Sequence, residues 1–200
     1  QVMEEYFDLI KERNEADQSL PKIEVLSTFV FTKLDSLGFE AGFNDIQESW
    51  YSSDLLEADI VLAPIHKNDH WTLIEVNLQS NTINYYDSII GSRFRSTAPR
   101  LMRKLFERIC ERAGVSRQFK TRIKERAPVQ GNGVDCGVFV CQNAEKIARG
   151  VLVNTRQEEM MAARKQMMIE LVVGKLMNHR GTAGQLLRRL PPVSIGVEPK

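Results

Sequence analysis

A cysteine and a glutamine at either end of the segment QGNGVDCG carry the clearest chemistry in this chain. Gln130 opens the segment, Cys136 lies near its end, and a helical pattern over 138–149 follows, closed by Gly150. This order predicts a helix whose first turn contains Cys136. The free N–H groups and positive dipole of a helix start favour an anion, so they favour a thiolate. We therefore weigh a thiol nucleophile with an amide donor for an oxyanion against a small, buried, inert cysteine.

A thiol nucleophile needs a base, and two histidines, His66 and His70, stand upstream of the cysteine. Two β-rich segments, 72–78 and 82–87, are joined by a short turn and predict an antiparallel hairpin. His70 begins the first strand and Asp87 ends the second, so both lie at one end of the hairpin. We expect Asp87 to accept the Nδ1 proton of His70 and to leave Nε2 facing the thiolate. His66 is the rival base, but it has no acid placed to orient it.

The order of these motifs resembles that of the ULP/SENP family of SUMO-specific cysteine proteases, in the adenain-like clan. The resemblance rests on His70-Trp71, Asp87 and the pattern Q-x-N-G-x-D-C-G, and on three further segments: STFVFTKL, ADIVLAPIH and INYYDS. It implies an α+β fold of the papain-like, ULP/SENP type, with a mixed central sheet flanked by helices. The implied catalytic domain covers residues 1–179. The family's usual Trp-Leu-Asn-Asp-like opening would stand before this sequence begins, so we expect the domain to lack its N-terminal segment.

The resemblance also implies a role for each site residue. Cys136 would be the nucleophile, His70 the general base and acid, and Asp87 its orienting group. Gln130 would be the side-chain donor of the oxyanion hole, beside the backbone N–H of Cys136. The implied activity is hydrolysis after the C-terminal Gly-Gly of SUMO, in precursor maturation or in release from a substrate lysine, without a cofactor. The alternatives are a protease for another ubiquitin-like modifier and an inactive module that only binds such a modifier.

The two tryptophans of the chain both match family positions. Trp71 matches a tryptophan that covers the glycines of the substrate, and Trp50 aligns with the second tryptophan of that clamp. The commoner fate of a tryptophan is to fill a core or an interface. We favour the clamp because both tryptophans match.

Composition indicates one domain with a real core, because 42% of the 200 residues are hydrophobic. Twenty-seven basic against 26 acidic residues give a net charge of +1, which indicates neither nucleic acid nor a membrane as a partner. No apolar run approaches the length of a membrane span. Three cysteines without C-x-x-C spacing argue against a zinc site or a disulfide framework. We expect a monomer in a reducing compartment, nucleus or cytoplasm.

The remaining elements follow from periodicity. We expect helices over 2–10, 26–37 and 99–113, a strand over 59–65, and a last helix that opens with a capping box from Thr155 to Glu158. This last helix should bury five apolar side chains: Met160, Met167, Met168, Leu171 and Val172. Cys110 should lie in the core.

Alternating cations mark the extended run over 118–129, at positions 120, 122, 124 and 126. They indicate an edge strand protected from pairing by its charges, in preference to a groove for an acidic partner. Residues 180–200 carry glycines and prolines without periodicity, and we expect a flexible C-terminal tail.

Overall fold

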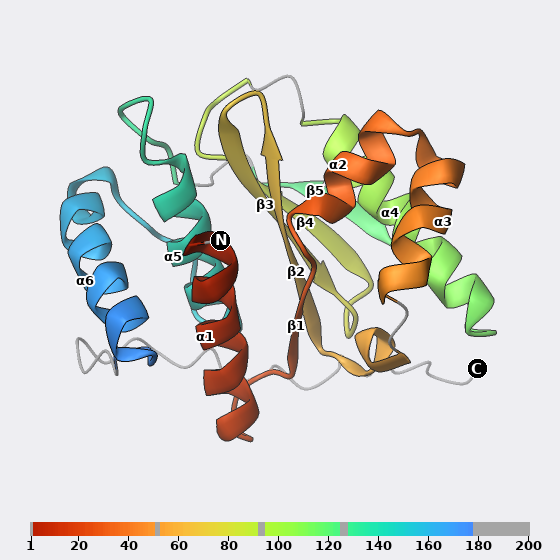
Figure 1. Ribbon diagram of the computed structural model, residues 1–200, viewed down its shortest axis with the longest axis horizontal. Helices are drawn as coiled ribbons and strands as arrows, with labels where there is room; N and C mark the ends of the chain where they lie inside the picture. The colour runs from red at the N-terminus through yellow and green to blue at the C-terminus, as the bar shows by residue number, and fades with distance from the viewer. Residues whose placement is uncertain (1, 51–52, 92–94, 125–127, 178–200) are drawn as a thin grey trace, which may run out of the picture.

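A mixed five-stranded sheet forms the centre of the molecule in the computed structural model, which describes residues 2–50, 53–91, 95–124 and 128–177 (Figure 1). The strands lie side by side in chain order: β1 (Ile23–Val25), β2 (Ile60–Lys67), β3 (His70–Asn77), β4 (Thr82–Tyr86) and β5 (Lys120–Ile123). The outer pairs β1–β2 and β4–β5 are parallel, whereas β2–β3 and β3–β4 are antiparallel. This architecture confirms the expected α+β class with a mixed sheet.

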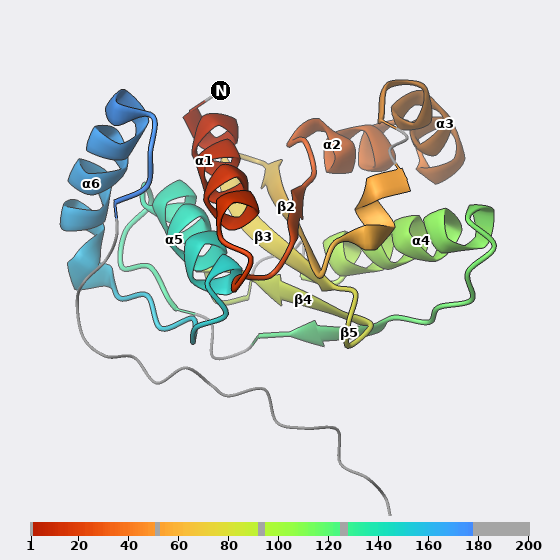
Figure 2. The same cartoon turned by 90° about the horizontal axis from the view of Figure 1, so that it is seen from below.

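Helices cover both faces of the sheet (Figures 1 and 2). One side carries α1 (Val2–Ala16), α5 (Cys136–Ala148) and, outside them, α6 (Met160–Val173), which follows a 3-10 turn, η2 (Gln157–Glu159). The other side carries α2 (Phe29–Ser36), α3 (Phe39–Trp50), a 3-10 turn, η1 (Ser53–Glu57), and α4 (Thr97–Arg112). Two apolar cores result, one on each face. Strand β4 is buried along its whole length because neither face meets water.

The β2–β3 connection is a two-residue turn that sets the register of the hairpin. Asn68 and Asp69 both have positive φ, 50° and 59°, a conformation that Asn and Asp tolerate better than most residues. Positive φ at both central positions is the geometry of a tight hairpin turn that matches the twist of the strands. The register that follows pairs His66 with Trp71 and Lys67 with His70. The turn thereby fixes where each of these side chains stands.

Helix α6 differs from the sequence prediction in its buried face. Met160 and Met167 are buried as expected, but Met168 and Val172 are 61% and 84% exposed. The buried face instead includes Glu170, whose carboxylate accepts a hydrogen bond of 3.0 Å from the Tyr6 hydroxyl. A buried carboxylate requires such partners. This polar contact with α1 therefore sets the rotation of α6, which periodicity alone placed wrongly.

The predicted capping box at Thr155 is also wrong by one residue. The Arg156 N–H donates to the Glu159 carboxylate over 3.2 Å, so the chain turns into η2 one residue later than expected. Thr155 is buried and its hydroxyl donates to Asn143 Oδ1 over 2.9 Å. The tertiary contact with α5 thus replaces the expected local cap.

The structure also tests the expected bounds of other elements and the burial of Cys110. The helix expected over 26–37 begins only at Phe29, and β1 and α3 had not been predicted. Cys110 is buried as expected. Strand β5 is an exposed edge strand of the described sheet, as expected for the cations at positions 120 and 122, whereas position 126 lies outside the described residues. No helix among the described residues is long and apolar enough to cross a bilayer. The expected tail, 180–200, lies outside the described residues.

Candidate active site

His70 and Asp87 meet at one end of the β3–β4 hairpin. The Nε2 atom of His70 lies 2.7 Å from Asp87 Oδ1, and about nine-tenths of each side chain is buried. The Asp87 carboxylate also accepts hydrogen bonds from the Tyr85 hydroxyl, at 2.9 Å, and from the Ile89 N–H, at 2.8 Å. These two donors fix the carboxylate, and the carboxylate fixes the imidazole ring. The structure therefore brings together the base and the orienting acid that the sequence predicted.

The two ring nitrogens of His70 have roles opposite to those expected. Asp87 bonds Nε2, so Nδ1 is the nitrogen left for the thiol, and Nδ1 is buried without a hydrogen-bond partner among the described residues. The hydrogen bond with Asp87 raises the pKa of His70; burial acts against this shift, and interaction with the Cys136 thiol adds to it. The reversal follows from ring orientation, which sequence spacing does not determine. The chemistry expected of the pair is unchanged.

Cys136 is the first residue of α5 and is 7% exposed. Asp135 is the N-cap residue, and its carbonyl accepts the first hydrogen bond of the helix, from Phe139 N–H, over 2.9 Å. The N–H groups of residues 136–138 consequently have no acceptor within the helix. They point, with the positive end of the helix dipole, to the place where a thiolate or an oxyanion would lie. The cysteine is thus placed as predicted.

Gln130 is buried and held by Ser88, the residue after Asp87. Its backbone N–H donates to the Ser88 carbonyl over 2.8 Å, and its Oε1 accepts from the Ser88 hydroxyl over 2.6 Å. The side-chain Nε2 donates to the Asn132 carbonyl, which uses one of its two hydrogens. The second hydrogen remains for a ligand. Sequence reasoning missed Ser88, although its position directly after the orienting acid was a signal.

The loop between Gln130 and Cys136 is fastened by side chains that the sequence did not single out. The Asp135 carboxylate accepts hydrogen bonds from Asn132 at 2.6 Å, from Gln157 at 2.7 Å, and from Arg164 at 2.9 and 2.6 Å. Gln157 also accepts from the Gly131 N–H over 2.6 Å. Burial alone would raise the pKa of Asp135, but these hydrogen bonds outweigh it and hold the pKa below its ordinary value.

Trp71 lies over the start of α5. A Cβ added to Gly137 would stand 3.6 Å from Trp71 Cδ1 and 3.4 Å from the Met3 methyl group, which are ordinary van der Waals distances, so the indole and the Met3 side chain both lie close to the first turn of α5. The Trp71 ring also contacts the His66 ring, with 4.5 Å between the ring centroids. His66 is exposed, and its ring lies against this indole. Trp71 stands beside the candidate nucleophile as predicted.

The expected place of Trp50 in the clamp stays a prediction. Helix α3 ends at Trp50 on the face of the sheet that carries α2 and α4, whereas α5 lies on the opposite face (Figures 1 and 2). Helices α3 and α5 thus lie on opposite faces of the sheet, and the expected pairing of Trp50 with Trp71 around one substrate is not tested by the backbone alone. The side chain of Trp50 lies outside the described part of the structure. Sequence alignment gave no information on which face α3 would cover.

An open groove of about 950 Å³ runs past Cys136 between α1 and α6. Its lining includes Trp71 and Gly137 on one side, and Met3, Met167 and Leu171 from the two helices. The nucleophile candidate is therefore accessible from solvent along a largely apolar channel.

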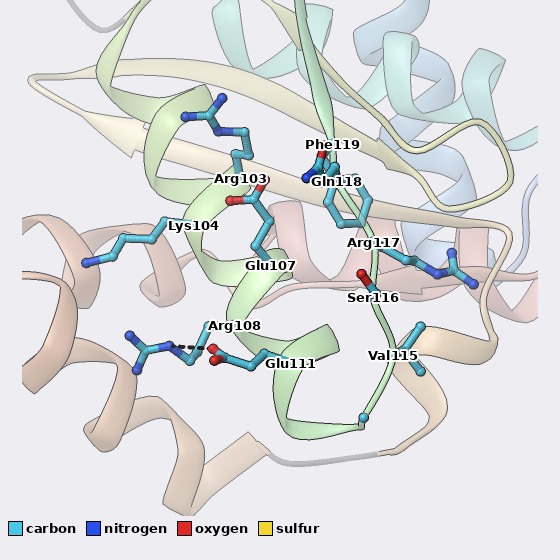
Figure 3. A pocket seen from close by; sticks show the side chains of 11 residues that line it. Arg103, Lys104, Glu107, Arg108, Glu111, Val115, Ser116, Arg117, Gln118 and Phe119 are labelled. Carbon is cyan, nitrogen blue, oxygen red and sulfur yellow. Dashed lines mark ion pairs between the residues drawn. The ribbon is translucent and has the colours of Figure 1, made fainter.

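A second groove, of about 860 Å³, lies along α4 and the segment 114–119 (Figure 3). Charged side chains of both signs line it, and Arg108 pairs with Glu111 over 3.5 Å. It contains none of the catalytic candidates. Within the described ranges no group of three or more His, Cys, Asp or Glu side chains is arranged to hold a metal ion.

A family model described as "Ulp1 protease family, C-terminal catalytic domain" matches residues 1–173. The chain belongs to the Ulp1 protease family. Among its relatives, Sentrin-specific protease 2 of Homo sapiens is 30% identical over 186 residues, which cover 88% of this chain and 30% of that protein. Sentrin-specific protease of Caenorhabditis elegans is 28% identical over 180 residues, covering 88% of this chain and 25% of that protein. The chain thus spans under a third of the length of these relatives.

Solved structures show the same fold. The catalytic domain of the Chaetomium thermophilum Ulp1-like SUMO protease superposes with a TM-score of 0.71 at 23% identity, covering 88% of this chain and 71% of that one. The C-terminal Ulp1 protease domain in complex with SMT3, the yeast ortholog of SUMO, gives a TM-score of 0.67 at 22% identity, covering 85% and 75%. These likenesses confirm the expected Ulp1-type fold.

Proposed function

We propose that this domain is a thiol-dependent SUMO endopeptidase and isopeptidase that cleaves after a C-terminal Gly-Gly. The observation that carries the proposal is the His70–Asp87 pair of 2.7 Å beside a cysteine at the first position of α5. Membership of the Ulp1 protease family supports the same reaction class. An inactive binding module would not need this oriented imidazole, so the geometry favours the enzyme.

The arrangement supports a two-step hydrolysis. In the first step His70 takes the proton of the Cys136 thiol, the sulfur attacks the glycine carbonyl, and the carbonyl oxygen becomes an oxyanion bonded by Gln130 Nε2 and the Cys136 N–H. His70, protonated, gives its proton to the departing amine as the C–N bond breaks, which leaves a thioester on Cys136. In the second step His70 takes a proton from water. The resulting hydroxide attacks the thioester and the C–S bond breaks. His70 returns its proton to the Cys136 sulfur, and the carboxylic acid product leaves and loses its own proton to the solvent.

The preference for glycine would come from the channel beside Cys136. Trp71 lies over the start of α5, and the Cβ position of Gly137 is within 3.6 Å of its ring. We infer that a substrate backbone passes beside this indole, which leaves room for hydrogens but not for side chains. A Gly-Gly terminus is then the substrate feature, and steric exclusion by Trp71 is the source of selectivity.

The partner would be SUMO and its conjugates. Support comes from the solved Ulp1 domain in complex with SMT3, the yeast ortholog of SUMO, which shares this fold. The three cysteines are free and buried, which fits a reducing compartment, and we place the enzyme in the nucleus or the cytoplasm.

The test is a panel of SUMO, ubiquitin and a third ubiquitin-like modifier, each ending in an electrophile in place of the last carbonyl. The SUMO probe should form a covalent adduct with the unmodified domain and none with Cys136→Ala. A faster adduct with ubiquitin or the third modifier would change the assigned substrate. Binding of SUMO without an adduct, in a domain whose Cys136 is reduced, would replace the enzyme by a binding module.

A further inference from the structure

The Asp135 carboxylate points away from the helix that its own residue caps. Asp is among the preferred N-cap residues because its carboxylate usually accepts from the N–H of the second or third helical residue, here Gly137 or Val138. In α5 this side-chain cap is missing. Both oxygens of Asp135 are used elsewhere: Oδ1 by Arg164, and Oδ2 by Asn132 and Gln157. The carboxylate is thus held outward by four hydrogen bonds.

Arg164 supplies two of these hydrogen bonds and the only positive charge among the donors. Its Nε and Nη2 lie 2.9 and 2.6 Å from Asp135 Oδ1, and Nη2 also donates to the Val134 carbonyl over 2.7 Å. A planar guanidinium can make these contacts together because its N–H donors have fixed directions in one plane. The ammonium group of a lysine does not have this geometry. Arg164 comes from α6, 29 residues further along the chain, so the last helix reaches the residue before the nucleophile.

A carboxylate in the capping position would interfere with the proposed reaction. It would put a negative charge on the N–H groups beside the Cys136 sulfur, where the thiolate and the oxyanion need the positive end of α5. Like charges at such close range disfavour one another. The site therefore benefits if this carboxylate is both turned away and neutralised.

We propose that Arg164 is a positioning residue, which holds Asp135 away from the start of α5 and keeps the positive helix end for the thiolate and the oxyanion. This inference rests on the proposed function for its catalytic consequence, but its effect on thiol reactivity is independent of any substrate. Arg164 lines the same groove as Cys136, but its side-chain hydrogen bonds go to Asp135 and to the Val134 carbonyl. Its influence passes through Asp135.

The experiment measures two rates in four forms of the domain: unmodified, Arg164→Met, Lys165→Met, and the double variant Arg164→Met/Asp135→Asn. The first rate is alkylation of Cys136 by iodoacetamide at pH 7, with Cys136→Ala as the blank. The second is kcat for a SUMO substrate that releases a fluorophore after Gly-Gly. Lys165 is the matched control because it is exposed on α6 next to Arg164 and removes the same charge.

Arg164→Met should slow alkylation about fivefold, the scale of a charge at a helix end, and lower kcat about tenfold with little change in KM. Lys165→Met should change neither rate. The double variant should recover most of the alkylation rate, because an asparagine side chain carries no charge to return to the helix start. A role limited to holding the loop in place predicts no recovery.

The proposal is overturned if Arg164→Met alkylates like the unmodified domain, or if the double variant reacts no faster than Arg164→Met. Circular dichroism of all four forms separates these outcomes from unfolding. If the unmodified domain alkylates readily but cleaves no SUMO substrate, the proposed function fails. The alkylation rates then still decide the role of Arg164.

Discussion

Ser88 is joined to Gln130 by two hydrogen bonds, one from its hydroxyl to Gln130 Oε1 at 2.6 Å and one from the Gln130 N–H to its carbonyl at 2.8 Å. The preceding residue, Asp87, holds His70 at 2.7 Å. Two consecutive residues at the end of β4 therefore hold the base and the oxyanion donor. The backbone of Asp87 and Ser88 therefore links the positions of His70 and Gln130, which preorganises the site.

Replacing Ser88 by alanine should reduce turnover more than binding. Without the hydroxyl, the buried Gln130 Oε1 loses its donor and the amide is free to rotate away from the oxyanion. We expect kcat to fall about tenfold and KM to change little. Ser80→Ala, in the exposed turn at the other end of the hairpin, is the control. Steady-state kinetics with an unchanged kcat for Ser88→Ala would show that Gln130 is held without it.

Alanine substitution of each of the three cysteines should have different effects on activity. Cys136→Ala should abolish cleavage and electrophile labelling while SUMO binding remains. Cys110→Ala and Cys141→Ala should keep both activities, because these thiols are buried in the two cores, and burial raises the pKa of Cys141 to about 12. Each should lose about 1–3 kcal/mol of stability through packing. Mass spectrometry of labelled protein decides this, and a label on either core cysteine would contradict it.

The His70–Asp87 pair should leave a signature in the pH dependence of stability. Its hydrogen bond raises the pKa of His70 above the ordinary value of 6.5. The pair favours the charged ring, so its contribution is complete below that value and is lost as pH rises through the raised pKa. The difference in melting temperature between the unmodified domain and Asp87→Asn should be largest near pH ~6 and smaller near pH ~9.

The control for this measurement is Asp8→Asn, an exposed carboxylate on α1. It should show no such trend with pH. The same shift predicts that the alkaline limb of kcat/KM moves to lower pH in Asp87→Asn, because the imidazolium is lost earlier. A stability difference that grows from pH ~6 to pH ~9 would have the wrong sign for this pair.

Trp71 should exclude side chains from the channel. A SUMO substrate with either terminal glycine changed to alanine should lose kcat/KM by orders of magnitude, because a displacement of ~1 Å at the carbonyl can cost about 100-fold. Trp71→Ala should lower turnover of the normal substrate and narrow the gap between glycine and alanine substrates. Kinetics on the four combinations test this. Equal turnover of both substrates by the unmodified domain would remove steric exclusion as the source of specificity.

His66 should act through Trp71 and not as the base. Its ring lies against the indole with centroids 4.5 Å apart, and such aromatic pairs are worth about 0.5–1.5 kcal/mol. His66→Ala should therefore raise KM by about two- to tenfold and leave most of kcat. His66→Phe, which keeps an aromatic partner, should restore KM. If His66→Ala is folded but has no turnover while His70→Ala remains active, then His66 is the base and His70 is not.

The sequence predicted the candidate catalytic residues better than the side chains that hold them in place. Cys136, Gln130, His70 and Asp87 could be found because each belongs to a short local pattern: a helix start, or an end of one hairpin. The clamp role of Trp50 stays a prediction, because its side chain lies outside the described residues. Each error in the prediction involves a quantity that local spacing leaves open.

Rotations and long-range contacts account for the remaining misses. Which nitrogen of His70 meets Asp87 depends on the rotation of one ring. The buried face of α6 depends on Glu170 finding Tyr6, 164 residues away. In the sequence Arg164 looks like an ordinary surface cation, because its contacts with Asp135 form only when α6 packs beside α5. Such contacts form only in the folded chain and leave no periodicity in the sequence.

The contact between Tyr6 and Glu170 joins α1, near the start of the described chain, to α6, near its end. Contacts of this sequence separation are slow to form, because a long loop must close before they can stabilise anything. During synthesis, the cysteine would leave the ribosome before α6, and its loop would lack Arg164 until the last helix docks. We expect the thiol to acquire its full reactivity only when the whole domain has been made, which keeps a half-synthesised chain from acting as a hydrolase.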